Sequence, residues 1–478
     1  MIPKAALPGL ALDQASPLPV YRQLYARIAE AVLAGRLAPG TRLPSARSLA
    51  AQLAVARGTV EAAYQLLAGE GYIVTRCAAG TLVDPALDRK MLRPGRDVRA
   101  SVSDAGGAVE GRPTGTPLLF QMGLPALDAF PHKIWARLVA RQARALGPAD
   151  LAYQPAAGHW HLRVQIARYL AVARGVACDP AQVIVTTGYQ GALGLITRVL
   201  MRPGDAIFVE YPGYPIGHAA LRLAGMRLVG APVDEEGVDI APLQAKHRGV
   251  RFALVTPTHE FPLGLTLSLQ RRMALLAWAE QSDSWIIEDD YDAEFRYQGR
   301  PLPALKSLDR QGRVLFIGTF SKVLSPGLRV GYLVAPTALA QRFTEAAAAL
   351  QPPPAALVQA AVADFIDKGN LARHIRRMRL LYAERRAALT AALRAEVGSL
   401  LGIELQAGGM HLLARLPRGS NDTFLVAKLS RRGIAAAPLS TCGADRPFAA
   451  GLLLGFTNIA AKNAAAAARA LADALGRT

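Results

Sequence analysis

Residues 314–336 read VLFIGTFSKVLSPGLRVGYLVAP, and this stretch is the strongest single indication of the fold. It opens with an apolar run, typical of a buried strand of a parallel sheet, and ends in Thr319 and Ser321. Lys322 follows at once. An amine at the end of a buried strand is partly desolvated, which favours the neutral form that Schiff-base chemistry needs. Arg329, seven residues later, could neutralise a phosphate. Taken alone, a lysine after a strand is more often a surface residue.

A second apolar strand is followed by acidic residues in WIIEDDYDAEF, residues 285–295. Pyridoxal phosphate needs a carboxylate against its ring nitrogen, and Asp289 stands at the end of this strand. Tyr291 could bring a phenol to the edge of the same ring. Paired aspartates after a strand could instead be metal ligands, but no third or fourth ligand stands at a suitable spacing, so we expect no metal site.

Two further stretches fit the same cofactor. In QVIVTTGYQGALGLITRVL, residues 182–200, a strand runs into Gly188, Tyr189 and Gln190 and then into a helix, whose first backbone amides could bind a phosphate. Many α/β proteins have such a turn. In VEYPGYP, residues 209–215, Tyr214 could stack on the ring, although a buried core tyrosine is an equally good interpretation.

The composition of the chain changes along its 478 residues. Residues 14–85 are densely patterned, and residues 86–117 are rich in Gly, Pro, Ser and charge with few large apolar side chains, so we expect a flexible linker there. Residues 118–478 alternate helix-like and strand-like stretches. This alternation predicts an α/β domain built on a largely parallel sheet.

The N-terminal block has the periodicity of three helices and a hairpin, which predicts a winged helix-turn-helix. Leu24 and Ile28 recur at helical spacing in the first helix, Leu49 belongs to a short second helix with Ser45 as its candidate N-cap, and Val60 belongs to a third helix. YIVTR and TLV flank a turn that contains glycine, which is typical of a hairpin.

Basic and hydroxyl residues of this block stand where such a motif contacts DNA. The second helix of the pair enters the major groove with its N-terminal residues nearest the bases, and here that end carries Arg57, Gly58 and Thr59. Arg47 could reach a phosphate or a base edge, and Arg76 with the turn at Gly80 would form the wing. Each arginine considered alone is more often a solvated surface residue.

The block 17–83 resembles the GntR-type winged helix-turn-helix along its whole length. The matching motifs are G-x-L-x-P-G-x-x-L-P-S-x-R, L-A-x-x-L-x-V-x-R-x-T-V and Y-x-x-L-x-x-E-G-Y. A departure is Ala56, where that family often has Ser or Thr. The resemblance implies that the DNA-contacting positions are Ser45, Arg47, Arg57, Thr59 and Gly80.

Residues 118–478 resemble the fold-type I aminotransferases, which implies a homodimer and a smaller C-terminal α+β subdomain. By this resemblance Lys322 bonds to pyridoxal 5'-phosphate, Asp289 pairs with the ring nitrogen, Tyr291 contacts the ring hydroxyl and Tyr214 stacks on the ring. Tyr153, in LAYQPAAG, matches a residue that reaches the phosphate of the neighbouring subunit. The phosphate itself is implied to lie among Gly188, Tyr189, Gln190, Thr319, Ser321 and Arg329.

A GntR-type head, a linker and an aminotransferase-like body in this order are similar to the MocR-type transcriptional regulators. FPHKIWARL, YQPAAGHWHLR, TPTHEFPLG, IIEDDYDAEFRY and GTFSKVLSPGLRVGY look like that family in particular. Two positions depart from working aminotransferases. Phe261 stands where they carry an Asn against the cofactor, and Leu453 stands where they carry the Arg that clamps the substrate carboxylate.

Composition sets the expected partners and compartment. The formal charge of +19 favours polyanions such as DNA. Cys77, Cys178 and Cys442 are too few and too scattered for a disulfide framework or a metal site, so we expect reduced thiols in the cytoplasm. We find no signal peptide and no membrane span.

Three functions fit these features. The first is a regulator of a double-stranded DNA operator that binds pyridoxal phosphate and senses an amine, an amino acid or the cofactor itself. The second is an active aminotransferase with an accessory DNA-binding domain, against which Phe261 and Leu453 argue. The third is a regulator whose body has lost the cofactor and serves for dimerisation, against which the presence of Lys322, Asp289 and Arg329 argues. We favour the first, with at most residual half-reactions in place of regular turnover.

Overall fold

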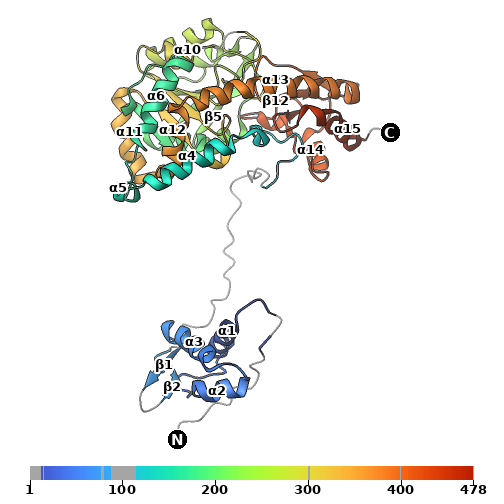
Figure 1. The fold of residues 1–478 in the computed structure, drawn as a ribbon. Coiled ribbons are helices and arrows are strands. Elements are labelled where there is room, and N and C mark those ends of the chain that lie inside the picture. The colour runs from blue at the N-terminus through green and yellow to red at the C-terminus, as the bar shows by residue number, and fades with distance from the viewer. Residues whose placement is uncertain are drawn as a thin grey trace. The chain divides into compact units, whose positions relative to one another are not determined.

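The computed structural model of the protein describes residues 12–13, 16–76, 80–87, 115–299, 302–398 and 400–476. The chain divides into two compact units, Met1–Ala105 and Gly106–Thr478. We call the described parts of these units the head and the body (Figure 1). Cys77 and most of the expected linker, residues 88–114, lie outside the described residues.

The head has the three helices and the hairpin that the sequence predicts. Its elements are α1 (Val20–Leu33), α2 (Ala46–Leu53), α3 (Arg57–Gly69), β1 (Ile73–Arg76) and β2 (Gly80–Val83). The strands pair antiparallel, with Arg76 opposite Gly80. Leu24, Ile28 and Val60 are buried in one core because the apolar side chains of each helix recur on a single face. The predicted winged helix-turn-helix is confirmed.

The N-terminal ends of α2 and α3 are capped differently. The side-chain oxygen of Ser45 accepts a hydrogen bond from the backbone N–H of Ser48, over 3.2 Å, so α2 has the N-cap that the sequence predicts. Ala56 precedes α3 and offers no side-chain acceptor. The head therefore satisfies the first turn of α2 from within and leaves that of α3 without a side-chain cap.

We expect Ser45→Ala to destabilise α2 by about 1 kcal/mol, because the lost cap leaves a helical N–H without its partner. Hydrogen exchange of the full-length protein, read by mass spectrometry on peptides covering Ala46–Leu53, measures the opening free energy of α2. Ser48→Ala removes a hydroxyl from the same turn without removing the acceptor and is the matched control. Equal exchange in the two variants would contradict the capping role.

The body is built on an eight-stranded sheet in the order β3-β10-β9-β8-β7-β4-β5-β6. Parallel pairing joins β9, β8, β7, β4 and β5, whereas β10 is antiparallel to both of its neighbours. The expected largely parallel sheet is confirmed, with β10 and β6 as the reversed strands. The bounds are β3 (Val183–Thr186), β10 (Gly331–Val334), β9 (Val314–Thr319), β8 (Trp285–Asp290), β7 (Phe252–Val255), β4 (Ala206–Tyr211), β5 (Arg227–Asp234) and β6 (Gly237–Val238).

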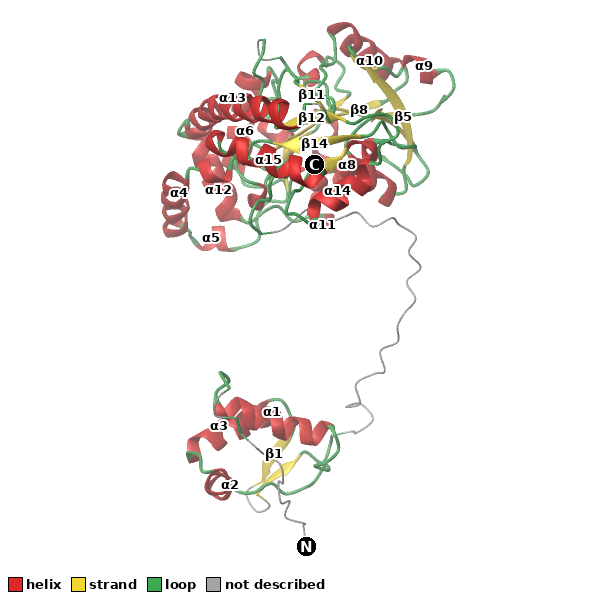
Figure 2. Ribbon diagram, turned by 90° about the vertical axis from the view of Figure 1, so that its right-hand side faces the viewer, coloured by secondary structure: helices red, strands yellow, loops and turns green. Residues whose placement is uncertain are grey.

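Helices cover both faces of this sheet (Figure 2). Side chains of a strand alternate between the faces, so Leu315 lies in a core with α7, α8 and α11 while its neighbour Phe316 lies in a core with α6 and α12. The helices are α4 (His132–Ala145), α5 (Pro148–Leu151), α6 (Trp160–Arg174), α7 (Tyr189–Leu200), α8 (Pro215–Leu223), α9 (Ala241–Gln244), α10 (Leu269–Gln281), α11 (Thr337–Leu350) and α12 (Ala356–Asp367).

A smaller α+β subdomain completes the body, as the sequence predicts. It follows the long helix α13 (Asn370–Val397) and has a four-stranded antiparallel sheet in the order β11-β12-β14-β13. Its elements are β11 (Gly402–Glu404), β12 (His411–Arg415), α14 (Asp422–Ser430), β13 (Ala437–Pro438), β14 (Gly451–Gly455) and α15 (Ala464–Leu475).

Parallel strands place the ends of separate sequence stretches at one edge of the large sheet. Because β8 and β9 are neighbours, with Asp289 opposite Ile317, the residues that follow them emerge together. In open α/β sheets this carboxyl edge is the usual ligand site. The fold thus brings together the polar residues that follow each strand.

In the part of the chain that the structure describes, no helix combines the length and the apolar character that crossing a membrane requires.

Candidate functional site

A cavity of about 390 Å³ lies at this edge, between the large sheet and the smaller subdomain. Its walls come from the segment 118–123, the N-terminal ends of α7 and α8, the residues after β8 and β9, and strands β12 and β14. The predicted cofactor residues that line it are Tyr189, Gln190, Tyr214, Asp289, Tyr291, Thr319, Ser321, Lys322 and Arg329.

Lys322 is positioned by the turn after β9, and its amine contacts a part of the chain far away in sequence. Nζ donates a hydrogen bond to the carbonyl oxygen of Gly123 over 2.9 Å. Gly123 has φ +78°, and a Cβ there would lie 2.7 Å from Nζ. The glycine is therefore required by both the backbone conformation and the approach of the lysine. The sequence analysis did not identify Gly123, because nothing local marks it.

Asp289 is a buried carboxyl on the cavity wall, 7 % exposed. None of the described residues forms a hydrogen bond or an ion pair with it. Burial raises the pKa of Asp289 well above its ordinary value, the nearby Asp290 and Glu210 raise this pKa further, and Lys322 opposes them. A buried carboxyl without a donor favours a ligand that brings a proton or a positive charge to it.

Another part of the cavity is suited to an anion. Gly188 has φ +83° and is the N-cap of α7, whose first amides point out of the helix. Arg329 lies alongside: its Nη2 donates to the carbonyl oxygen of Thr187 over 2.7 Å, and a Cβ on Gly188 would come within 3.4 Å of the same nitrogen. Gly188 itself does not line the cavity, and it lies next to the guanidinium of Arg329.

Aromatic rings form the side of the cavity near α7 and α8. The ring of Tyr214 meets Tyr189 edge-on at a centroid distance of 5.7 Å and Phe261 at 5.3 Å. The buried hydroxyl of Tyr189 has no hydrogen-bond partner among the described residues. Tyr214 therefore lies at the cavity surface, where it can contact a planar ligand.

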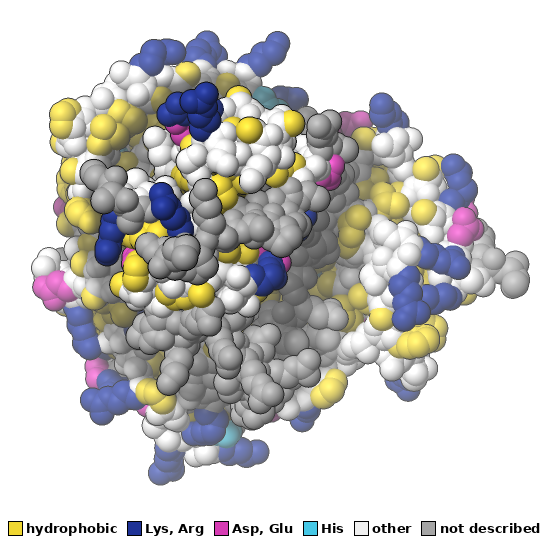
Figure 3. Space-filling view, turned by 90° about the horizontal axis from the view of Figure 1, so that it is seen from below, with side chains coloured by type: hydrophobic (Ala, Val, Ile, Leu, Met, Phe, Trp, Pro, Cys, Tyr) yellow, Lys and Arg dark blue, Asp and Glu magenta, His cyan; other side chains and the backbone are white. Residues whose placement is uncertain are grey.

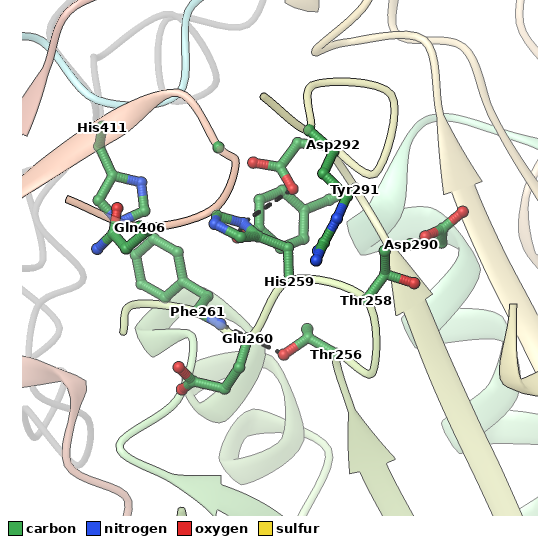
Figure 4. A network of polar contacts seen from close by, with 12 residues as sticks. Thr256, Thr258, His259, Glu260, Phe261, Asp290, Tyr291, Asp292, Gln406 and His411 are labelled. Atoms are coloured by element: carbon green, nitrogen blue, oxygen red, sulfur yellow. Dashed lines mark hydrogen bonds and ion pairs between the residues drawn. The ribbon is translucent and has the colours of Figure 1, made fainter. Parts of the chain in front are cut away.

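A polar cluster that the sequence analysis did not assign lies where β8 ends (Figure 4). The imidazole Nδ1 of His259 lies 2.9 Å from the hydroxyl of Tyr291 and 3.1 Å from Oδ1 of Asp292. His411, on β12, packs against Phe261 at a ring-centroid distance of 5.6 Å. TPTHEFPLG and IIEDDYDAEFRY contained His259, Phe261, Tyr291 and Asp292, but only packing makes them one cluster.

The two departures from working aminotransferases both lie in this cavity. Phe261 lines it beside Tyr214, and Leu453, on β14, lines it with a side chain that is 1 % exposed. Leu453 packs with Leu413, Leu439 and Cys442 in an apolar cluster. Neither position offers a polar group to a ligand.

Besides Gly188, Tyr153 is the predicted cofactor residue that the described cavity walls do not include. It is fully exposed in the single chain and precedes α6. The resemblance assigned it to the phosphate of a second subunit, so its role stays a prediction.

Glu210, on β4, gives the body a testable pH dependence. Its carboxyl is buried and accepts hydrogen bonds from the backbone N–H and the hydroxyl of Thr256. Burial raises the pKa of Glu210 to about 7 from 4.5, against the lowering effect of Thr256. Between these two pH values the folded state holds a proton that the unfolded state releases. The stability of the body should therefore fall as the pH rises from about 4.5 to 7.

We expect Glu210→Gln to remove part of this fall, up to about 1.4 kcal/mol per pH unit. All four tryptophans lie in the body, so their fluorescence during urea unfolding across the range from acidic to neutral pH reports that unit. Glu235→Gln changes an exposed carboxyl and is the control. The same pH slope in the wild type and in Glu210→Gln would contradict the assignment.

In the head, the predicted DNA-contacting residues lie at the recognition end of the motif. Arg57 is the first residue of α3 and pairs with Glu61 over 2.7 Å, with both side chains exposed. Among the described residues, none forms a hydrogen bond or an ion pair with the side chains of Arg47 or Arg76. Thr59 lies in the first turn of α3. Gly80, with φ +76°, begins β2 and lies against the guanidinium of Arg42.

The charge of the chain suits a polyanion. Residues 17–85 hold seven arginines and four acidic residues. On the face of the molecule drawn in Figure 3, dark blue Lys and Arg side chains are spread among neutral and apolar ones, and acidic side chains are sparse. Such a surface attracts nucleic acid without specifying a sequence.

Comparisons with known proteins agree with both parts. The family "Bacterial regulatory proteins, gntR family" matches residues 20–83, and "Aminotransferase class I and II" matches residues 127–460. The probable rhizopine catabolism regulatory protein MocR of Rhizobium meliloti is 39 % identical over 459 residues, covering 94 % of this chain and 92 % of MocR. The pyridoxine biosynthesis transcriptional regulator PdxR of Corynebacterium glutamicum is 36 % identical over 454 residues, covering 94 % of each chain.

Among solved structures, the α-aminoadipate aminotransferase LysN of Thermus thermophilus, complexed with N-(5'-phosphopyridoxyl)-L-leucine, is 31 % identical. The match has a TM-score of 0.68 and covers 75 % of this chain and 92 % of LysN. The Pyrococcus horikoshii kynurenine aminotransferase, in complex with PMP, is 29 % identical with a TM-score of 0.67, over 74 % of this chain and 89 % of that enzyme.

Proposed function

We infer that ligand binding in the body controls DNA binding by the head, because this chain belongs to the MocR-type transcriptional regulators, in which a gntR-family head precedes an aminotransferase class I and II body. It is a DNA-binding transcriptional regulator, and its relatives favour this function over that of an aminotransferase with an accessory domain. Its cofactor is pyridoxal 5'-phosphate.

The residues of the cavity fit this cofactor. Asp289 is a buried carboxyl that lacks a donor among the described residues, as a partner for a protonated ring nitrogen requires. Gly188 and Arg329 leave the N-terminal end of α7 open to an anion. We propose that Lys322 holds the aldehyde carbon, that Tyr214 lies against the ring and that Tyr291 contacts its hydroxyl. The phosphate would lie among Gly188, Tyr189, Gln190, Thr319, Ser321 and Arg329.

When bound, pyridoxal phosphate supplies an aldehyde that joins primary amines and a ring that withdraws electrons. The chain's own residues then set which amine can reach it. Asp289 would keep the ring nitrogen protonated, and Phe261 and Leu453 would exclude water from the apolar side of the cavity. Tyr291 and His259 share a hydrogen bond that can move a proton near the ring edge.

We propose that the protein is a homodimer in which Tyr153 of one chain completes the site of the other. Tyr153, Leu151 and Trp160 are all exposed in the single chain, and large apolar side chains left exposed in a monomer are often covered at an interface. Two heads on one dimer would suit an operator with two half-sites. We place the head at 14–85, the linker at 86–117 and the body at 118–478, and the protein in the cytoplasm.

Binding in the body can change DNA binding only through a difference in ligand affinity between two conformations of the protein. The ligand we propose is a small amine, an amino acid or pyridoxal phosphate itself. The observation that carries this proposal is the presence of a cofactor cavity and a DNA-binding head on one chain.

A gel-shift titration of the full-length protein on the DNA upstream of its own gene tests it. We expect a retarded band at low salt whose midpoint moves when pyridoxal phosphate or a candidate amine is added. A band that no such addition moves would contradict control by the body. The lack of any retarded band would contradict DNA binding on this operator.

A further inference from the structure

The cations that line the cavity are few. Among the described residues, Lys322 and Arg329 are the only Lys or Arg side chains on its walls. Arg329 lies beside the N-terminal end of α7 and donates to Thr187, and Lys322 is the residue that holds the cofactor. While Lys322 is bonded to the cofactor and Arg329 lies against its phosphate, neither cation is available to a carboxylate on an arriving ligand.

His411 also lines the cavity, but it does not supply the missing positive charge. The ring nitrogen Nε2 of His411 lies 2.9 Å from the carbonyl oxygen of Pro262, where it donates. Burial lowers the pKa of His411 to about 4, so the imidazole is neutral at physiological pH. The remaining ring nitrogen is then an acceptor, which repels a carboxylate.

The wall around Leu453 is apolar. Leu453 is 1 % exposed and packs with Leu413, Leu439 and Cys442, while Phe261 and Met122 pack against that cluster. A carboxylate placed here would lose its water and gain no donor, which is strongly unfavourable. An alkyl or aromatic group would be favoured for the same reason.

A buried carboxyl group faces the same space. Asp292 lines the cavity and is 1 % exposed, and neither of its oxygens has a hydrogen-bond donor among the described residues. Its one described ionic contact is with His259, over 3.1 Å. A second positive charge on a ligand would find a partner in Asp292, whereas a negative charge would be repelled.

We propose that the effector is a primary amine without a carboxylate or other acidic group, whose remainder is apolar or cationic. This inference rests on the proposed function, because it takes the cofactor aldehyde as the group that captures the amine. The sequence analysis allowed an amine, an amino acid or the cofactor itself as the effector, and this proposal chooses the amine.

The experiment compares amino acids with the amines that lack only their carboxylate. Full-length protein loaded with pyridoxal phosphate is titrated with phenylalanine and 2-phenylethylamine, and with lysine and 1,5-diaminopentane. The readout is the absorption band of the Lys322-bound cofactor. We expect each amine to change this band with an apparent Kd at least tenfold lower than that of its amino acid. Asp292→Asn should weaken the binding of 1,5-diaminopentane and leave that of 2-phenylethylamine unchanged.

Leu453→Arg tests the same inference in the opposite direction. The new guanidinium would supply the cation that the wall lacks, so the preference should move at least tenfold toward the amino acids. Leu453→Met keeps the apolar wall and is the matched control, with the wild-type preference expected. Both variants should keep the cofactor band, which shows that they fold and bind the cofactor.

The outcomes separate the two levels of inference. Equal or tighter binding of the amino acids by the wild type, or an unchanged preference in Leu453→Arg with its band intact, would overturn the effector class and leave the proposed function standing. A protein that forms no cofactor band at all would overturn the proposed function, and this inference with it.

Discussion

Lys322→Ala is expected to leave the purified protein colourless after dialysis, with no absorption band from bound cofactor. We propose that the Lys322 amine bonds the aldehyde, and the other residues of the proposed cofactor site would offer only non-covalent contacts. Without the covalent bond, pyridoxal phosphate should exchange freely with the buffer. The effect of amines on DNA binding should disappear together with the band.

Lys133→Ala is the matched control, because it removes an exposed lysine on α4 that is not part of the cavity walls. It should keep the band and the response. Retention of the full response to amines in Lys322→Ala would show that the body acts without covalent capture. That result would favour non-covalent binding of the amine by the body.

The second large effect is expected on the DNA side. Arg47→Ala and Arg57→Ala should each weaken operator binding by about 1–3 kcal/mol, roughly 5- to 150-fold in Kd, if the side chain reads a base. If the side chain contacts a phosphate, the loss of affinity should be similar on all DNA sequences. The slope of log Kd against log salt concentration should then fall by about one. Both follow from gel-shift titrations on operator and unrelated DNA at several salt concentrations.

Arg36→Ala is the control for charge alone, because Arg36 is exposed just after α1 and pairs with Glu30. It removes the same formal charge from the head at a position outside the helix-turn-helix. If Arg47→Ala and Arg57→Ala weaken binding no more than Arg36→Ala does, these positions contribute only to the general positive charge of the head.

The fold could be predicted from the sequence where the pattern that indicates an element lies within a few consecutive residues. The apolar strand before Lys322, the strand before Asp289 and the Ser45 cap each show themselves within a few residues, and the structure has all three. Parallel pairing places the carboxyl ends of these strands side by side at one edge of the sheet, independently of the loops that connect them.

The rest of the site depends on contacts between distant parts of the chain. Gly123 lies 199 residues before Lys322, and His411 comes from the smaller subdomain to a wall that Phe261 shares. Asp292 stands one residue beyond Tyr291, and the sequence gives no sign that its oxygens lack donors. Such features arise from packing of the two sheets and have no periodicity that a single sequence could reveal.

The hydrogen bond from Lys322 to Gly123 also has a bearing on how the body could communicate with the head. A free ammonium has three N–H donors, whereas a nitrogen that is doubly bonded to carbon has at most one, and the new bond fixes its direction. Bonding of the cofactor to Lys322, and replacement of that bond by one to an incoming amine, would therefore change the hydrogen bond to the carbonyl oxygen of Gly123. That carbonyl belongs to the segment 118–123, the first stretch of the body that follows the linker along the chain. The nitrogen that we propose to bond the cofactor is thus hydrogen-bonded to the first described segment of the body, and a change at that nitrogen would alter how this segment is held.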